Sequence, residues 1–350
     1  MQLQEERVTP EAAAVPTLLN IAGGYTLARC LHVVADLGVA DALDRAPSTA
    51  AELAATVGAH ADALERVLRL LAAHGVFEAR DGGFAHTPAS QLLRADHPRS
   101  MRAVVQLFGL PPLWESQGAL MHTVRTGLLA GEQVAPGGFW GYLSRHPDAR
   151  TVFNAAMSAK AQGHVAGVLA AYDFSGFGTI GDIGGGRGHL LRAILETAPA
   201  ARGVLFDLPP VIEEARGLAS KRLTLQAGDF FTDTLPVCDA YLLMEVLHDW
   251  ADAEAVAILE AIRRAAPAHA ALLVIEQMVP DDPGPHWAKT LDLHMLALLG
   301  GQQRSRQQYS ALLERAGFAL QREIDTRADI AILEATPTSD EHAAGTVRRL

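Results

Sequence analysis

A histidine follows a short apolar run, at a place where an enzyme can hold a base. Residues 240–244 form the run, and the segment after it reads Glu-Val-Leu-His248-Asp249-Trp. If the run is a strand of an open α/β sheet, His248 lies just past its carboxyl end, where such sheets bind their ligands. A neutral imidazole there can take a proton from a hydroxyl group. The alternative is structural: Asp249 or Asp252 caps a helix that begins near Ala253, and the histidine only packs.

A glycine-rich turn occupies residues 182–188, with the sequence Asp-Ile-Gly-Gly-Gly-Arg-Gly. Glycines let a backbone turn sharply and approach a ligand closely. Gly184, Gly186 and Gly188 have the spacing G-x-G-x-G, which differs from the G-x-G-x-x-G of dinucleotide sites. Asp182, ahead of them, repels a pyrophosphate and attracts a cation. The turn therefore indicates a cofactor site, with a plain tight turn as the alternative.

Acidic residues also follow the next two β-type runs. Asp207 stands roughly 20 residues after the glycines, where a carboxylate can accept hydrogen bonds from the hydroxyls of a ribose. Its alternative role is a helix cap ahead of Pro209. Asp229 can accept from an adenine amino group while Phe230 covers the ring face. Acidic residues at three strand ends favour a nucleoside with a cationic centre over one with phosphates.

These residues require a sheet whose strands all end at one edge. Short β-type runs alternate with helical patterns after residue 172, which predicts a Rossmann-like, doubly wound α/β sheet. Two final runs without a helix between them are expected to pair antiparallel at the edge of the sheet. The strands are expected at 179–183, 203–206, 223–226, 240–244, 271–276, 318–324 and 330–335, with helices such as 189–196 and 252–265.

The amino-terminal part is predicted to be helical and to contain a winged helix. Residues 17–43 have apolar helical faces, and Thr49 and Glu52 form a capping box for a helix that Gly58 ends. A second helix and a hairpin around residues 81–83 follow. A winged helix often binds DNA, but the candidate recognition helix carries Asp62, Glu65, Arg66 and Arg69, without the basic stripe that DNA readers need. A dimerising role is therefore favoured.

The expected organisation is a helical and winged-helix dimerisation domain at residues 1–107 and a cofactor-binding domain at residues 108–350. Residues 108–172 of the second domain are expected to be helical. The net charge of -11 disfavours nucleic acids and anionic membranes as partners, which leaves a small molecule. No leader is visible, no uncharged apolar run reaches the ~18 residues that span a bilayer, and Cys30 and Cys238 read as reduced thiols. A cytoplasmic protein is expected.

The ordered motifs resemble those of the two-domain small-molecule O-methyltransferases, which include plant caffeic acid methyltransferases and bacterial polyketide-tailoring and hydroxyneurosporene enzymes. The resemblance covers nearly the whole chain. Its most specific segments are Asp182-Ile-Gly-Gly-Gly, Asp207-Leu-Pro, Gly228-Asp-Phe-Phe and His248-Asp-Trp, in this order. Phe153-Asn-Ala-Ala-Met157 is similar to a family segment that lines the acceptor pocket.

The resemblance implies an S-adenosylmethionine-dependent O-methyltransferase of secondary metabolism that acts as a homodimer on a hydroxylated aromatic or polyketide-like acceptor, with no metal. His248 is implied as the general base and Glu276 as the residue that orients it. The implied cofactor contacts are Asp182, Gly184, Gly186, Asp207, Asp229, Phe230 and Trp250. Phe153, Met157 and Met295 match acceptor-pocket positions, and His294 is expected to face that pocket or to pack within a helix.

Two residues depart from the family pattern. Gln303 stands where the family carries a second glutamate near the histidine, and a neutral amide can orient the ring but cannot stabilise its charge. Met244 stands where the family often has a lysine, which affects a cofactor contact. The first departure keeps open a non-methylating reaction on the same scaffold, such as hydroxylation, decarboxylation or a pericyclic step. A winged-helix regulator is the third hypothesis.

Overall fold

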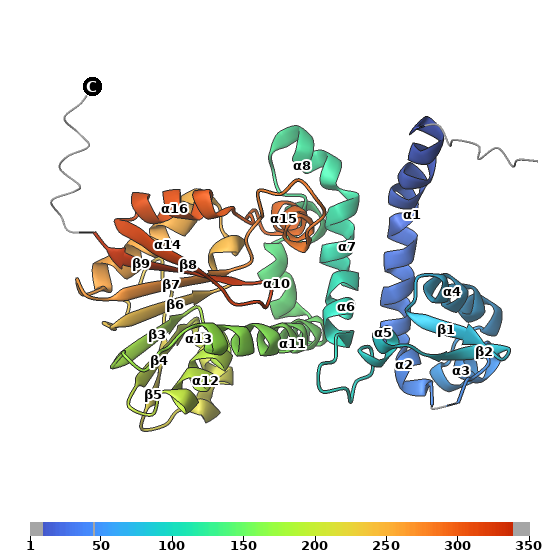
Figure 1. The fold of residues 1–350 in the computed structure, drawn as a ribbon, viewed down its shortest axis with the longest axis horizontal. Helices are drawn as coiled ribbons and strands as arrows, with labels where there is room; N and C mark the ends of the chain where they lie inside the picture. The colour runs from blue at the N-terminus through green and yellow to red at the C-terminus, as the bar shows by residue number, and fades with distance from the viewer. Residues whose placement is uncertain (1–9, 45, 339–350) are drawn as a thin grey trace, which may run out of the picture. The chain divides into compact units, whose positions relative to one another are not determined.

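The computed structural model describes residues 10–44 and 46–338, and these form two compact units (Figure 1). The first unit comprises Met1–Pro111 and Pro147–Ala159, and the second comprises Pro112–His146 and Lys160–Leu350. The long helix α11 therefore contributes its first part to one unit and its second part to the other. Each unit has a hydrophobic core of its own.

The first unit confirms the predicted helices and hairpin. Thr49 and Glu52 form the capping box: the Thr49 hydroxyl accepts from the Glu52 N–H at 3.3 Å, and the Glu52 carboxylate accepts from the Thr49 N–H at 2.8 Å. Gly58 ends that helix with φ 70°. The elements of this unit are α1 (Pro10–Leu37), α2 (Val39–Ala42), α3 (Ala50–Val57), α4 (Ala61–Ala73), β1 (Phe77–Arg80), β2 (Gly83–His86), α5 (Pro88–Gln91) and α6 (Arg102–Gly109).

Helix α1 exposes a row of large apolar side chains. Leu18, Leu19, Ile21 and Tyr25 are 67–73% exposed. By length and composition the segment Ala14–Leu37 is also apolar enough to cross a membrane, which the sequence reading did not anticipate because Arg29 and Asp36 interrupt it. An exposed apolar surface of this kind is typical of a protein–protein or membrane interaction site.

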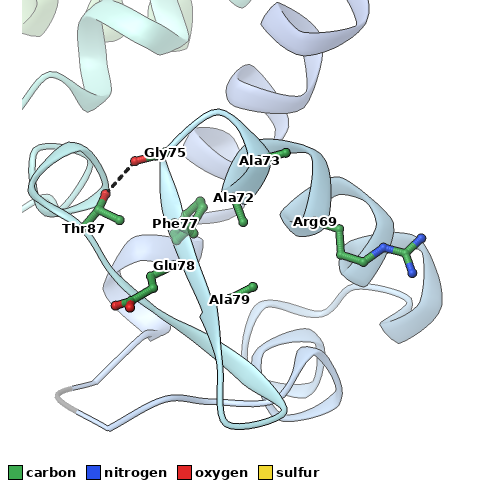
Figure 2. A pocket seen from close by; sticks show the side chains of 8 residues that line it. All are labelled: Arg69, Ala72, Ala73, Gly75, Phe77, Glu78, Ala79 and Thr87. Atoms are coloured by element: carbon green, nitrogen blue, oxygen red, sulfur yellow. Dashed lines mark hydrogen bonds between the residues drawn. The ribbon is translucent and has the colours of Figure 1, made fainter. Parts of the chain in front are cut away.

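A shallow recess lies between α4 and the hairpin of the first unit (Figure 2). Its volume is about 590 Å³. Arg69 and Glu78 are its charged lining residues, whereas Phe77 and three alanines supply an apolar floor. Arg69 is two-thirds exposed and lies 4.0 Å from Glu65, so its charge is already partly balanced. The recess contains none of the chemistry-bearing residues identified in the sequence.

The second unit contains a seven-stranded sheet in the order β5-β4-β3-β6-β7-β9-β8. The first five of these are parallel, and β9 pairs antiparallel with both β7 and β8, as predicted. The doubly wound Rossmann-like sheet is thereby confirmed. Its strands are β3 (Thr179–Ile183), β4 (Arg202–Asp207), β5 (Leu223–Ala227), β6 (Ala240–Met244), β7 (Ala271–Glu276), β8 (Phe318–Asp325) and β9 (Ala331–Pro337).

Alternate residues of each strand face opposite helical layers, as the period of two requires. Tyr241 and Leu243 of β6 pack with α14 and α16, whereas Leu242 packs with α11 and α12. Because both faces are covered, every residue of β7 is buried. The helices associated with this unit are α7 (Pro111–Gly118), α8 (Leu120–Thr126), α9 (Gly131–Val134), α10 (Gly138–Arg145), α11 (Pro147–Ala171), α12 (His189–Thr197), α13 (Pro209–Glu214), α14 (Asp252–Ala265), α15 (Trp287–Leu298) and α16 (Arg306–Arg315), with 3-10 turns η1 (Arg216–Leu218) and η2 (Leu247–Asp249).

Candidate functional site

The carboxyl ends of the parallel strands carry the predicted site residues along one edge of the sheet. Asp229 follows β5, Asp207 ends β4, the glycine turn follows β3, His248 follows β6, and Glu276 ends β7. This is the edge at which open α/β sheets bind their ligands. The strand order therefore brings together residues that are far apart in the sequence.

The glycine turn has the left-handed backbone that only glycine adopts without strain. Gly184, Gly186 and Gly188 have φ values of 69°, 58° and 66°. A Cβ added at Gly186 would have no atom of the described residues within 4 Å, so this side of the turn is open. At Gly184 a Cβ would lie 3.1 Å from Val246. The turn is thus tight on one side and has room for a ligand on the other.

Asp207 ties the end of β4 to the turn. Its Oδ2 accepts from the Gly186 N–H at 2.8 Å, and its Oδ1 accepts from the Leu208 N–H at 2.7 Å. Burial raises the pKa of Asp207, although these two hydrogen bonds oppose the shift. The side chain is partly exposed and does not cap α13. A half-open carboxylate beside the open face of the turn suits two ribose hydroxyls.

Asp182 lies beneath the turn instead of on its open face. It is 1% exposed, and a Cβ at Gly185 would come within 2.4 Å of its carboxyl group. Burial, and secondly the charge of Asp207, raise the pKa of Asp182 to about 7, against a hydrogen bond from the Leu191 N–H. This position indicates that Asp182 supports the turn from below, and its predicted contact with the cofactor stays a prediction.

Three aromatic rings gather beyond Asp229. The Phe230 and Phe231 rings both meet Trp250 edge to face, with centroid distances of 5.9 and 4.8 Å. Asp229 Oδ1 accepts from the Phe231 N–H at 2.9 Å, which shapes the segment that presents the rings. The structure therefore brings Phe230 and Trp250 together and adds Phe231, while their predicted contact with the cofactor stays a prediction. Edge-to-face aromatic groups of this kind offer an apolar wall for a planar base.

His248 and Glu276 form the central contact of the site. His248 Nδ1 lies 2.6 Å from Glu276 Oε2, and the two side chains are 8% and 0% exposed. Glu276 Oε1 accepts from the backbone N–H groups of Leu247 and His248 at 3.0 and 3.3 Å. With the carboxylate on Nδ1, the Nδ1 atom carries the hydrogen and Nε2 is left as the basic atom.

Acidic neighbours make His248 a stronger base than a free imidazole. Burial alone lowers the pKa of His248, but the charges of Glu276 and Asp249 and the Glu276 hydrogen bond raise it to about 9. Asp249 Oδ1 lies 3.4 Å from Nε2. Burial raises the pKa of Asp249 to about 6, against the attraction of His248. Asp249 is not the cap of α14, whose N-cap is Ala251.

Two residues that the sequence reading did not single out hold the turn that carries His248. Arg304, fully buried, donates to the carbonyl oxygens of Leu247 at 2.9 Å and Trp250 at 2.8 Å, and to Asp252 at 2.8 Å. Gly301 packs against the same backbone: a Cβ there would lie 2.0 Å from the His248 carbonyl oxygen. A glycine at position 301 allows this close approach, because no side chain separates the two backbone segments.

Gln303 is buried but does not bond to the histidine. Its amide nitrogen and oxygen have no hydrogen-bond partner among residues 10–44 and 46–338, while its backbone N–H donates to Asp292 at 2.8 Å. Asp249, and not Gln303, places a second polar group at His248. A direct catalytic role for Gln303 stays a prediction.

The predicted acceptor residues lie in different units. His294 and Met295 are on α15 in the second unit; Met295 is buried, and His294 Nδ1 lies 3.2 Å from Gln117 Nε2. Burial lowers the pKa of His294, which favours its neutral form. Phe153 and Met157 are on the part of α11 that belongs to the first unit, so their place in the pocket stays a prediction.

Two family models match the chain. One, described as an O-methyltransferase dimerisation domain, matches residues 19–96, and the other, described as an O-methyltransferase domain, matches residues 119–319. The dimerisation model covers the winged-helix-like region.

Individual relatives match nearly the whole chain. The phenazine O-methyltransferase PhzM of Lysobacter antibioticus is 42% identical over 335 residues, 93% of this chain and 98% of its own. An 8-amino-8-demethylriboflavin N,N-dimethyltransferase of Streptomyces davaonensis is 40% identical and covers 88% of this chain and 91% of its own. The solved SAH-bound form of CalO1, a methyltransferase in calicheamicin biosynthesis, is 33% identical with a TM-score of 0.84, covering 94% of this chain and 100% of that chain.

The Gly301 contact generates a prediction. Gly301→Ala should lower the free energy of unfolding by about 1–3 kcal/mol, because backbone atoms of the His248 turn must move to admit the methyl group. Turnover should fall with it, since His248 is displaced. Urea unfolding and initial rates measure the two effects. Gly163→Ala is the matched control, because it lies exposed in α11 with no described atom within 4 Å of the added Cβ. A Gly301→Ala variant as stable and active as the parent would contradict the assignment.

Proposed function

We propose that the chain methylates a hydroxyl group of an aromatic or polyketide-like small molecule. The basis is that it belongs to the two-domain O-methyltransferase family and is an S-adenosylmethionine-dependent methyltransferase. His248 is the general base of this reaction. The observation that carries the proposal is the buried His248–Glu276 pair at the edge of the cofactor sheet.

The residues at the sheet edge fit the cofactor. The open face of Gly186 leaves room beside Asp207, and the rings of Phe230, Phe231 and Trp250 provide an apolar wall. In this proposal Asp207 binds the ribose, Asp229 and the rings bind the adenine, and the glycine turn lies beneath the rest of the molecule. When bound, S-adenosylmethionine supplies an activated methyl group on a sulfonium.

His248 lowers the barrier by accepting the acceptor's proton at Nε2. A phenol has a pKa of ~10 and a free imidazole ~6.5, so proton transfer is uphill by roughly 5 kcal/mol. With the pKa of His248 raised to about 9, it lies much closer to that of a phenol, so the proton transfer is far less uphill. Glu276 fixes the tautomer and stabilises the imidazolium that forms. The remaining requirement is in-line positioning of the acceptor oxygen.

Acceptor recognition is proposed for α15 and α11. Met295 supplies an apolar wall, and His294, held by Gln117, supplies a neutral polar group. Phe153 and Met157 are the candidate acceptor residues on the part of α11 that belongs to the first unit. We further propose that residues 108–350 act as the methyltransferase domain, that residues 1–107 act as the dimerisation domain of a homodimer, and that the protein is cytoplasmic.

Methylation of nitrogen is a second candidate, because a relative that is 40% identical is an N,N-dimethyltransferase. The two reactions differ in their need for a base. A phenol must lose its proton as the bond to carbon forms, whereas a neutral amine already has a free electron pair. The strength of His248 favours oxygen. Incubation with methyl-labelled cofactor and matched phenol and aniline acceptors, followed by product mass and release of S-adenosylhomocysteine, tests the assignment and the methyl transfer itself.

Removing the base gives the first prediction of function. His248→Ala should lose roughly 10²- to 10⁴-fold in turnover of a phenol, the usual contribution of general-base catalysis. Binding of S-adenosylhomocysteine should be unchanged, as calorimetry can show. Full turnover in this variant would leave the histidine with a structural role only.

The pH dependence follows from the raised pKa of His248. A raised pKa keeps the imidazole protonated to higher pH, and only the neutral form is a base, so kcat/KM should increase with pH towards about 9. A pH profile already flat from pH 6 would be inconsistent with this base.

In Glu276→Gln the added NH₂ group faces Nδ1 and selects the wrong tautomer, so turnover should drop by at least about 10²-fold.

The apolar face of α1 gives a prediction for assembly. Ile21 and Tyr25 are 73% and 68% exposed, and a charge at either position would be buried in a dimer interface. The double variant Ile21→Glu/Tyr25→Glu should sediment as a monomer, while the parent sediments as a dimer. Val237→Glu, at a residue 70% exposed in the second unit, is the control and should remain dimeric. A dimeric Ile21→Glu/Tyr25→Glu variant would place the interface elsewhere.

A further inference from the structure

A cluster of three polar side chains lies at the end of β6, and the proposed function gives it no role. Lys160 Nζ pairs with one carboxylate oxygen of Glu245, and His164 Nδ1 lies 3.2 Å from the other. Lys160 and His164 are one helical turn apart on the part of α11 that belongs to the second unit. The three side chains are only 22%, 10% and 13% exposed for Lys160, His164 and Glu245.

A buried ion pair such as this one is weak evidence for a stabilising role. Taking an ammonium and a carboxylate out of water costs about as much as their attraction returns, and apolar side chains of the same size serve a core equally well. Glu245 also has φ 55°, a left-handed conformation that costs a residue with a Cβ and that concentrates at functional sites. Burial raises the pKa of Glu245, but Lys160, His164 and His248 hold it well below its usual range, so the carboxylate is charged.

The strand order shows what lies beside the cluster. Along the edge from β5 to β6 stand Asp229 for the adenine, Asp207 for the ribose, the glycine turn, and then Glu245. Val246, next to Glu245, is the residue that a Cβ on Gly184 would touch. The cluster therefore adjoins the glycine turn on the side away from the ribose position.

We propose that Lys160, His164 and Glu245 bind the amino-acid end of S-adenosylmethionine, with Lys160 and His164 facing its carboxylate and Glu245 facing its ammonium group. A site with both signs of charge repels a simple anion through Glu245 and a simple cation through Lys160, so a zwitterion is its complement. The amino-acid end of the cofactor is a zwitterion. This inference rests on the proposed places of adenine and ribose and not on His248 as a base.

Two ligands separate the amino-acid end from the rest of the cofactor. S-adenosylhomocysteine carries it, and 5′-methylthioadenosine has the same adenine, ribose and sulfur without it. Calorimetry of the full-length protein gives the affinity for each. The variants are Lys160→Met, Glu245→Gln and the double variant, which removes both charges and so leaves no unpaired buried ion if a single variant folds poorly. Lys221→Met, at an exposed lysine ahead of β5 and so at the opposite end of the strand, is the control.

We expect each variant to lose at least about tenfold in affinity for S-adenosylhomocysteine and to keep its affinity for 5′-methylthioadenosine within about twofold, because charge-assisted contacts are lost only for the first ligand. An equal loss for both ligands would overturn the proposal. Unchanged binding of both ligands would also overturn the proposal. If the KM for the acceptor then rises, the cluster serves acceptor recognition. If only the melting temperature falls, the cluster is structural. None of these outcomes depends on which atom is methylated or on the base, so they test this proposal separately from the reaction.

Discussion

The reaction centre depends on one buried carboxylate. Glu276 is completely enclosed at the end of β7, and a charge there is tolerated only because two backbone N–H groups and the His248 ring face it. The same three contacts fix where β6 must end and how the turn after it must run. Arg304 and Gly301 then hold the outer side of that turn. The position of the His248 ring relative to β6 and β7 is therefore set by the hydrogen bonds of Glu276 inside an apolar layer.

Much of this arrangement could be predicted from the sequence, because strands buried on both faces are written as apolar runs. Three strands, among them β6 and β7, begin and end where their runs do, and the parallel order alone takes Asp207, Asp229 and His248 to one edge. The capping box of Thr49 was equally legible, since its partners are three residues apart.

What the sequence could not show are contacts between segments that no periodic pattern links. Arg304 lies more than 50 residues from the carbonyl groups it holds, and Lys160 lies 85 residues before Glu245. The charge of Asp182 suits a cation, but the sequence does not show that the turn folds over this side chain at Gly185. Gln303 illustrates the same limit. The sequence shows that it replaces a family glutamate, but it does not show that its amide lacks a hydrogen bond within the described residues.

The backbone contact at Gly301 constrains substitution more strictly than a contact between side chains does. Any side chain at this position collides with main-chain atoms, so a substitution there displaces the turn that carries His248. His294 on α15, in contrast, bonds through its side chain to the side chain of Gln117. Under the proposed function, selection for a new acceptor would therefore act on side chains such as that of His294, while the turn that carries His248 is retained.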